Sequence, residues 1–202
     1  MTELRTLLLA SNNRHKWTEL TAMLSGLPYQ VVTLDDLGVR ATIEETGETF
    51  DDNARLKAET FAGLSGVLSL ADDSGIVVDA LNGDPGVRSA RYGGDGLDDA
   101  GRTQLLLANT AHLPDGERAA RFVCVIAIAE PGKPAQSFHG VVEGSLAHEV
   151  SGPNGFGYDP IFIPIGWNRT FGQATSEEKH ALSHRGMAME FAKIYLAELT
   201  NG

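Results

Sequence analysis

The chain has a single cysteine, no long hydrophobic run and a shortage of positive charge. Cys124 cannot form an internal disulfide, and it lies inside the apolar run FVCVIAIA. We therefore interpret it as a small core residue of a protein from a reducing compartment. The first apolar run, residues 7–10, is far too short for a signal peptide or a membrane span. These shortages favour a cytoplasmic protein with no membrane partner.

The charge balance is acidic. Sixteen Lys and Arg stand against twenty-seven Asp and Glu, which gives a formal net charge of −11. Such a field disfavours nucleic acids as partners, and it allows a phosphate substrate only where a metal and local basic side chains reverse it. A chain of 202 residues with 42% hydrophobic and 21% charged residues fits one folded domain, over 1–202, with a substantial core.

Hydrophobic periodicity predicts strands interleaved with helices and a hairpin near the middle of the chain. This pattern is typical of an α/β protein with a mixed sheet. Thr49 and Asp52 have the spacing of a helix capping box, and so do Thr175 and Glu178. The predicted strands cover residues 6–10, 31–34, 67–71, 76–78, 121–129 and 136–146, and the predicted helices follow residue 13, start at 49, cover 98–111 and start at 175.

Two adjacent carboxylates, Asp72 and Asp73, stand between the apolar runs 67–71 and 76–78, followed by a Ser74–Gly75 turn. Like charges this close repel, and burial makes their ionisation more costly, so a divalent metal or a cationic partner would stabilise them. The alternative is a solvated turn in which one Asp makes an Asx-type hydrogen bond. If extended geometry persists through the pair, the two side chains point to opposite faces.

Three further stretches carry polar side chains that could contact a nucleotide. The turn Ser11–Asn13 leads from a strand into a helix, a geometry that suits anions, with Lys16 in the first helical turn. Asn53 and Lys57 are four residues apart and share a helix face, although such a pair can simply be solvated. The loop 155–159 alternates glycine, aromatic and acidic residues, which suits a base pocket, unless its rings pack inward.

Together these pieces predict a nucleotide phosphohydrolase, in which a metal polarises a phosphoryl group and a carboxylate activates water. The chain has no Walker-type loop, no complete dinucleotide-binding glycine signature and no zinc-ligand spacing. A nucleophilic Ser74 would be hindered by its flanking acids and lacks a nucleophile elbow. The acids available for Mg²⁺ are Glu44, Glu45, Asp72 and Asp73, and the bases available for phosphate are Lys16, Lys57, Lys179 and Arg185.

Seven blocks, in order along essentially the whole chain, resemble the inosine/xanthosine triphosphate pyrophosphatase family. The resemblance implies hydrolysis of non-standard purine nucleoside triphosphates (ITP, dITP, XTP) to the monophosphate and pyrophosphate. It also implies a Mg²⁺ requirement, a homodimer, and an elongated two-lobed sheet with a nucleotide cleft between the lobes. The blocks are SNNRHK (11–16), EETGETFDDNARLKA (44–58), ADDSGIVVDAL (71–81), PGVRSARY (85–92), GFGYDPIF (155–162), EEK (177–179) and SHRG (183–186).

The resemblance also implies residue roles. Asp73 is expected to be the general base, and Asp73 with Glu44 or Glu45 is expected to hold the metal, which leaves the role of Asp72 open. The residues expected to bind substrate are Ser11, Asn12, Asn13, Arg14, His15, Lys16, Lys57, Ser74, Phe156, Gly157, Tyr158, Asp159, Lys179, His184 and Arg185.

Two positions depart from the family pattern. Asn12 stands where the first block usually has glycine, and Asp52 stands where glutamate is usual. Asn tolerates left-handed backbone better than most residues, and neither change removes a charge that the chemistry needs. Two rivals remain, namely a nucleotide pyrophosphatase with another base preference and a nucleotide-binding sensor without turnover. The intact set of acids argues against the sensor.

Overall fold

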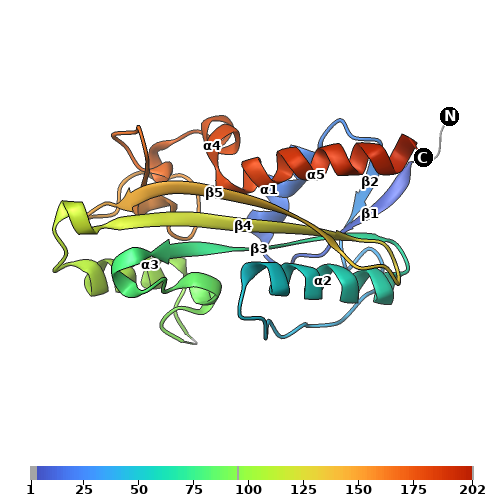
Figure 1. Ribbon diagram of the computed structural model, residues 1–202, viewed down its shortest axis with the longest axis horizontal. Coiled ribbons are helices and arrows are strands. Elements are labelled where there is room, and N and C mark those ends of the chain that lie inside the picture. The colour runs from blue at the N-terminus through green and yellow to red at the C-terminus, as the bar shows by residue number, and fades with distance from the viewer. Residues whose placement is uncertain (1–3, 95, 202) are drawn as a thin grey trace. The chain divides into compact units, whose positions relative to one another are not determined.

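The computed structural model describes residues 4–94 and 96–201. Figure 1 shows the helices and strands, coloured along the chain. In chain order they are β1 (Arg5–Leu9), α1 (Arg14–Leu24), β2 (Tyr29–Val32), α2 (Phe50–Ser65), β3 (Leu68–Val78), α3 (Asp99–Thr110), β4 (Ala119–Ala129), β5 (Gln136–Leu146), β6 (Phe162–Pro164), α4 (Ser176–Leu182) and α5 (His184–Asn201).

The six strands form one sheet in the order β2-β1-β3-β4-β5-β6. β1 pairs in parallel with β2 and with β3, and β5 pairs antiparallel with β6, so the sheet is mixed. β4 and β5 are consecutive in the chain and neighbours in the sheet, as the predicted hairpin requires. The prediction of an α/β fold with a mixed sheet is confirmed.

The chain divides into two compact units. The first unit holds the described residues up to Asp73, together with Cys124–Gly140 and the described residues from Arg185 onward. The second unit holds Ser74–Val123 and Val141–His184, so β3, β4 and β5 each contribute to both. The single domain over 1–202 and the cleft between two lobes stay predictions.

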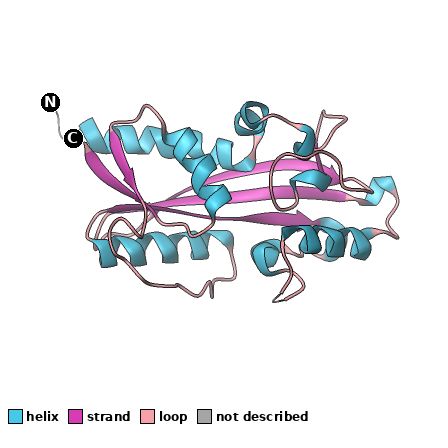
Figure 2. Cartoon of the chain, turned by 180° about the vertical axis from the view of Figure 1, so that it is seen from behind, coloured by secondary structure: helices cyan, strands magenta, loops and turns pink. Residues whose placement is uncertain are grey.

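In the first unit, alternate side chains of the strands supply two different cores. Leu7 and Leu9 of β1 pack with residues of α1 and α5, whereas Leu8 packs with residues of α2, because successive side chains of a strand point to opposite faces. Figures 1 and 2 show α1 and α5 on one side of these strands and α2 on the other. Adjacent polar side chains on one of these strands therefore face different helices.

The second unit is built around aromatic side chains. Phe122 of β4 lies 4.6 Å from the ring of Phe162 and 6.3 Å from the ring of Phe171, measured between centroids. Arg118, only 1% exposed, donates from its guanidinium to three backbone carbonyls. Those acceptors are the carbonyl oxygens of Leu146 (2.8 Å), Thr110 (2.6 Å) and Ala147 (2.7 Å). Arg118 thus ties the end of α3 to the end of β5.

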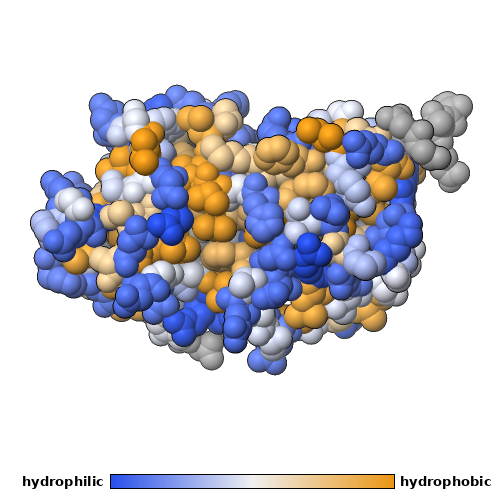
Figure 3. All heavy atoms as spheres, viewed as in Figure 1, coloured by the Kyte–Doolittle hydropathy of each residue, from blue (hydrophilic) through white to orange (hydrophobic). Residues whose placement is uncertain are grey.

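α5 has one buried and one outward face. Ala188, Met189, Ala192 and Leu196 belong to the first unit's core. Outward, Met187, Phe191 and Ile194 are exposed at helical spacing, and Figure 3 shows apolar surface where this helix runs. Within 4–94 and 96–201, no helix is long and apolar enough to cross a membrane.

The structure corrects four details of the prediction. Residues 68–78 form one continuous strand, so Asp72 and Asp73 lie inside β3 rather than at a turn. The last helix is two helices, since Ser183 leaves helical geometry (φ −75°, ψ 156°) between α4 and α5. The strand expected at 31–34 begins two residues earlier, at Tyr29. Leu64 follows Phe50, Ala54 and Phe61 at the spacing that predicts a buried helix face, but it is 56% exposed near the end of α2.

Candidate active site

The two adjacent aspartates face different helices. Asp72 shares the β3 face of Leu68 and Leu70, which pack with α1 and α5, and Asp73 shares the face of Ala71, which packs with α2. Both side chains are buried, 3% and 5% exposed. The backbone therefore stays extended through the pair, and the pair is not a solvated turn. Each carboxylate has its own set of partners.

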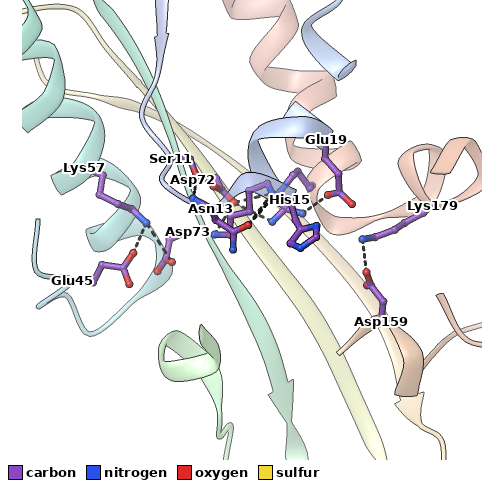
Figure 4. A network of polar contacts seen from close by, with 12 residues as sticks. Ser11, Asn13, His15, Glu19, Glu45, Lys57, Asp72, Asp73, Asp159 and Lys179 are labelled. Carbon is purple, nitrogen blue, oxygen red and sulfur yellow. Dashed lines mark hydrogen bonds and ion pairs between the residues drawn. The ribbon is translucent and has the colours of Figure 1, made fainter. Parts of the chain in front are cut away.

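The first set, the Asp73 cluster, consists of Asp73, Lys57, Asn53 and Glu45. Figure 4 shows Asp73, Lys57 and Glu45 side by side. The Lys57 ammonium lies 3.6 Å from Asp73 Oδ1 and 2.5 Å from Glu45 Oε1. Asn53 Nδ2 donates to Asp73 Oδ2 at 3.2 Å. The α2 spacing of four residues therefore delivers an amide and an ammonium to the two oxygens of one carboxylate.

Burial and charge act in opposite directions on this cluster. Burial raises the pKa of Asp73, and the ammonium groups of Lys57 and Lys16 only partly offset that rise. Burial alone would lower the pKa of Lys57, but the carboxylates of Asp73, Asp72 and Glu45 together raise it. At neutral pH the site thus combines a fixed cation with a carboxylate that binds protons more readily than an ordinary aspartate. Such a carboxylate suits proton abstraction.

The second set, the Asp72 network, consists of Asp72, Lys16, Arg185 and Glu19. Asp72 Oδ2 lies 3.1 Å from Lys16 Nζ and 3.1 Å from Arg185 Nη2. Glu19 Oε2 accepts from Arg185 Nη1 at 2.7 Å. Burial alone would raise the pKa of Asp72, but Lys16, Arg185 and Lys57 hold it well below its usual range. Asp72 is therefore a permanent anion that joins α1, β3 and α5.

The turn before α1 places its polar groups beside the Asp72 network. Asn13 caps the helix, and its Oδ1 accepts from the backbone N–H groups of His15 (3.0 Å) and Lys16 (3.1 Å). Ser11 Oγ accepts from Asn13 N at 3.3 Å. Asn12 to His15 are exposed, and Figure 4 shows Ser11 and Asn13 close to Asp72. Phosphate binding by this turn stays a prediction. The backbone N–H groups of His15 and Lys16 already donate to Asn13 Oδ1.

In the second unit, Lys179 and Asp159 form a buried ion pair with an N–O distance of 2.5 Å, and their side chains are 5% and 3% exposed. The Lys179 ammonium also lies 4.5 Å from the centre of the Phe156 ring. Asp159 Oδ2 accepts from the backbone N–H of Phe156 at 2.8 Å, and Gly155 leaves no room for a Cβ beside that carboxylate. Residues 156 and 159 of this loop thus hold the Lys179 ammonium in a fixed position.

Other predicted substrate contacts in this unit have protein partners. The Tyr158 side chain packs inward, and its hydroxyl donates to the carbonyl of Ser89 at 2.9 Å. The carbonyl of Gly157 accepts from Thr103 Oγ1 at 3.0 Å. His184, 4% exposed, stacks on Phe122 with 4.7 Å between centroids. The direct roles of these residues and of Ser74 in substrate binding stay predictions.

The donors around Asp73 fit Mg²⁺ shared with a substrate better than a cation held by protein alone. Nowhere in the described chain do three or more His, Cys, Asp or Glu side chains gather closely enough to hold a metal. Mg²⁺ usually takes one or two carboxylates and completes its shell with substrate phosphate and water. Asp73 and Glu45, joined through Lys57, are such carboxylates, whereas Glu44 is exposed.

Two contributors were missed as site residues from the sequence. The helical spacing indicates Asn53 only as a neighbour of Lys57, although a buried amide among core alanines needs a specific hydrogen-bond partner. Glu19 follows Lys16 by three residues on α1, which is the spacing of side chains on one face. Its partner, Arg185, is 166 residues away, and no local pattern indicates that contact.

Comparisons with known proteins identify relatives that match most of the chain. The model of the Ham1 family matches residues 7–194. A dITP/XTP pyrophosphatase of Streptomyces coelicolor is 46% identical, over 90% of this chain and 92% of that protein. A relative of the same name from Exiguobacterium sibiricum is 44% identical, over 91% and 93%.

Solved structures are similar as well. A HAM1 protein from Coxiella burnetii superposes with a TM-score of 0.88 at 42% identity, over 96% of this chain and 100% of that one. A nucleoside-triphosphatase, dITP/XTP pyrophosphatase, from Mycobacterium abscessus has a TM-score of 0.75 at 44% identity, over 93% and 97%. The resemblance read from the seven sequence blocks is confirmed, and the chain belongs to the Ham1 family.

Proposed function

We propose that this protein hydrolyses non-standard purine nucleoside triphosphates (ITP, dITP and XTP) to the monophosphate and pyrophosphate, and so keeps deaminated purines out of nucleic-acid precursors. The observation that carries the proposal is the Asp73 cluster, in which a buried carboxylate of raised pKa lies between an ammonium and an amide. The relatives named dITP/XTP pyrophosphatase, similar over nine-tenths of the chain, support the substrate class.

Asp73 is the general base in this proposal. It removes a proton from the water that attacks the triphosphate, and Lys57 and Lys16 stabilise the negative charge of the phosphate oxygens. A metal ion, once bound with substrate, would be held by Asp73 and Glu45 and would polarise a phosphoryl oxygen. Mg²⁺ is the expected ion because hard cations of this kind prefer carboxylate and phosphate oxygens.

Lys179 and Phe156 are proposed to recognise the base. A 6-oxo purine presents an oxygen acceptor where adenine presents an amino donor, and the Lys179 ammonium can only donate. Asp159 holds that ammonium in place, and the Phe156 ring offers an apolar surface for stacking. Hypoxanthine and xanthine nucleotides should therefore be preferred to ATP.

The proposal also includes a homodimer, as the family resemblance implies, and residence in the cytoplasm, as the single cysteine and the short apolar runs indicate. Light scattering tests the dimer directly. The experiment for the activity is pyrophosphate release from dITP with Mg²⁺, measured for the wild type and for Asp73→Asn. We expect turnover by the wild type and a loss of at least a hundredfold in the variant. Turnover by Asp73→Asn at the wild-type rate would show that Asp73 is not the base, and binding of dITP without any turnover would favour a sensor.

A further inference from the structure

Asn53 is a fully buried amide in the first part of α2, with 0% of its surface exposed. Its Oδ1 accepts from the backbone N–H of Gly47 at 2.8 Å. Its Nδ2 donates to the carbonyl of Gly47 at 3.4 Å and to Asp73 Oδ2 at 3.2 Å. One side chain therefore bonds to both backbone polar groups of Gly47 in the acidic loop and to the proposed general base.

The contact with Gly47 holds the acidic loop 44–48 against the start of α2. A Cβ at Gly47 would lie 2.6 Å from Asp52 Cβ and 2.7 Å from Asn53 Oδ1, so only glycine fits at this approach. Asp52 is itself fixed, because it closes the capping box with Thr49. The loop that carries Glu45 is thus held in place at Gly47, two residues after Glu45.

The contact with Asp73 acts on orientation rather than on charge. The amide is neutral, so its N–H aligns the carboxylate without forming an ion pair. With Oδ2 held by Asn53, Oδ1 lies on the side of Lys57, 3.6 Å from its ammonium. An ionised carboxylate has about four lone-pair directions, and Asn53 occupies one of them, which leaves others for water and metal.

We propose that Asn53 is a positioning residue for the hydrolysis: it sets the plane of the Asp73 carboxylate and ties the acidic loop to the same point. The inference rests on the proposed function, in which Asp73 is the base and Glu45 a metal ligand. Geometry of this kind matters because a misplacement of about 1 Å can reduce turnover about a hundredfold. A residue that only stabilised α2 would change the melting temperature and leave the rate per folded molecule unchanged.

The test compares four variants with the wild type. Asn53→Ala removes all three hydrogen bonds. Asn53→Asp keeps an acceptor for the Gly47 N–H, loses the donor to Asp73 and adds a negative charge beside it. Ala54→Gly is the matched stability control: this neighbour is also 0% exposed in α2 and makes no polar side-chain contact. Asp73→Asn reports on the proposed function itself.

Four quantities are measured for each protein: kcat for dITP with Mg²⁺, KM for the same substrate, the melting temperature, and hydrogen exchange of the peptide 44–49 by mass spectrometry. We expect Asn53→Ala to lower kcat about 10- to 100-fold with KM within about threefold, and to lose protection at Gly47. Asn53→Asp should lower kcat by a similar factor and keep that protection. Ala54→Gly should lower the melting temperature by roughly 2–4 °C with kcat unchanged.

The outcomes separate the two claims. If Asp73→Asn keeps the wild-type rate, the proposed base is wrong, whatever Asn53 does. If Asp73→Asn is inactive but Asn53→Ala keeps kcat within twofold, the proposed function stands and the positioning role is overturned. Equal losses of kcat in Ala54→Gly and Asn53→Ala would likewise overturn it, since the loss would then follow the stability of α2. If hydrogen exchange of the peptide 44–49 is unchanged in Asn53→Ala, Asn53 does not hold the acidic loop 44–48 in place.

Discussion

Replacing Asp72 by asparagine removes one charge from the Asp72 network and keeps nearly the same shape. The side chains of Asp72 and Arg185 are each 1% exposed, so the charge left on Arg185 cannot be hydrated without opening the core. Removing one partner of a buried ion pair costs about 3–5 kcal/mol. Arg185 keeps Glu19 at 2.7 Å, and the Lys16 side chain is 15% exposed, so we expect the lower end of this range.

A loss of about 3 kcal/mol corresponds to a fall in Tm of roughly 6–12 °C for a protein of this size. The loss should also depend on pH in a defined direction. The folded-state pKa of Asp72 is held well below the value of about 3.9 expected in the unfolded chain. Its contribution to stability is therefore complete above about pH 4 and declines as the pH falls below that value.

The assay is urea unfolding of the wild type and Asp72→Asn at pH 7, 5 and 3.5, with Asp35→Asn as the control. Asp35 is exposed, and its substitution should change stability by less than about 0.5 kcal/mol. The difference between wild type and Asp72→Asn should be equal at pH 7 and 5 and smaller at pH 3.5. A difference below about 1 kcal/mol at pH 7, or one that grows on acidification, would refute the reasoning.

Three other predictions follow from single side chains. Arg118→Met leaves three backbone carbonyls without their donor, and urea unfolding should show a loss of about 3 kcal/mol or more; a loss within 0.5 kcal/mol would contradict this. Burial raises the pKa of the Cys124 thiol to about 12. A colorimetric thiol reagent at pH 8 should therefore label the protein only after unfolding, and rapid labelling of the folded protein would contradict this prediction. Lys57→Met should lower kcat/KM for dITP by about a hundredfold or more, because a fixed cation near the phosphates is lost, and an unchanged value would exclude phosphate binding by Lys57.

Much of the fold could be predicted because local signals were consistent with each other. Thr49 and Thr175 begin helices with the predicted capping boxes, and the apolar runs became strands of a mixed sheet. The opposite orientations of the Asp72 and Asp73 side chains also followed from strand periodicity, whereas the role expected for Asp73 came from the family resemblance. The break at Ser183 was not predictable, because the helical pattern continues across it and neither proline nor glycine stands there.

The candidate site was harder to predict wherever partners are distant in the sequence. The Asp73 cluster joins residues within 28 positions of each other, and Lys57 was identified from its helix face. The Asp72 network depends on Arg185, which lies 113 positions from Asp72. Whether an aspartate ends in a solvated turn or in a buried ion pair is decided by such long-range packing, which a single sequence does not encode locally.

The most direct test of the proposed function is a substrate panel measured on one preparation of the enzyme. Initial rates of pyrophosphate release are compared for dITP, XTP, dATP and dGTP at equal concentration, with Mg²⁺ and with excess chelator. The proposed function predicts kcat/KM for dITP and XTP at least about a hundredfold above dATP and well above dGTP, and no release in chelator. Equal rates for dITP and dATP, or release of orthophosphate in place of pyrophosphate, would contradict it.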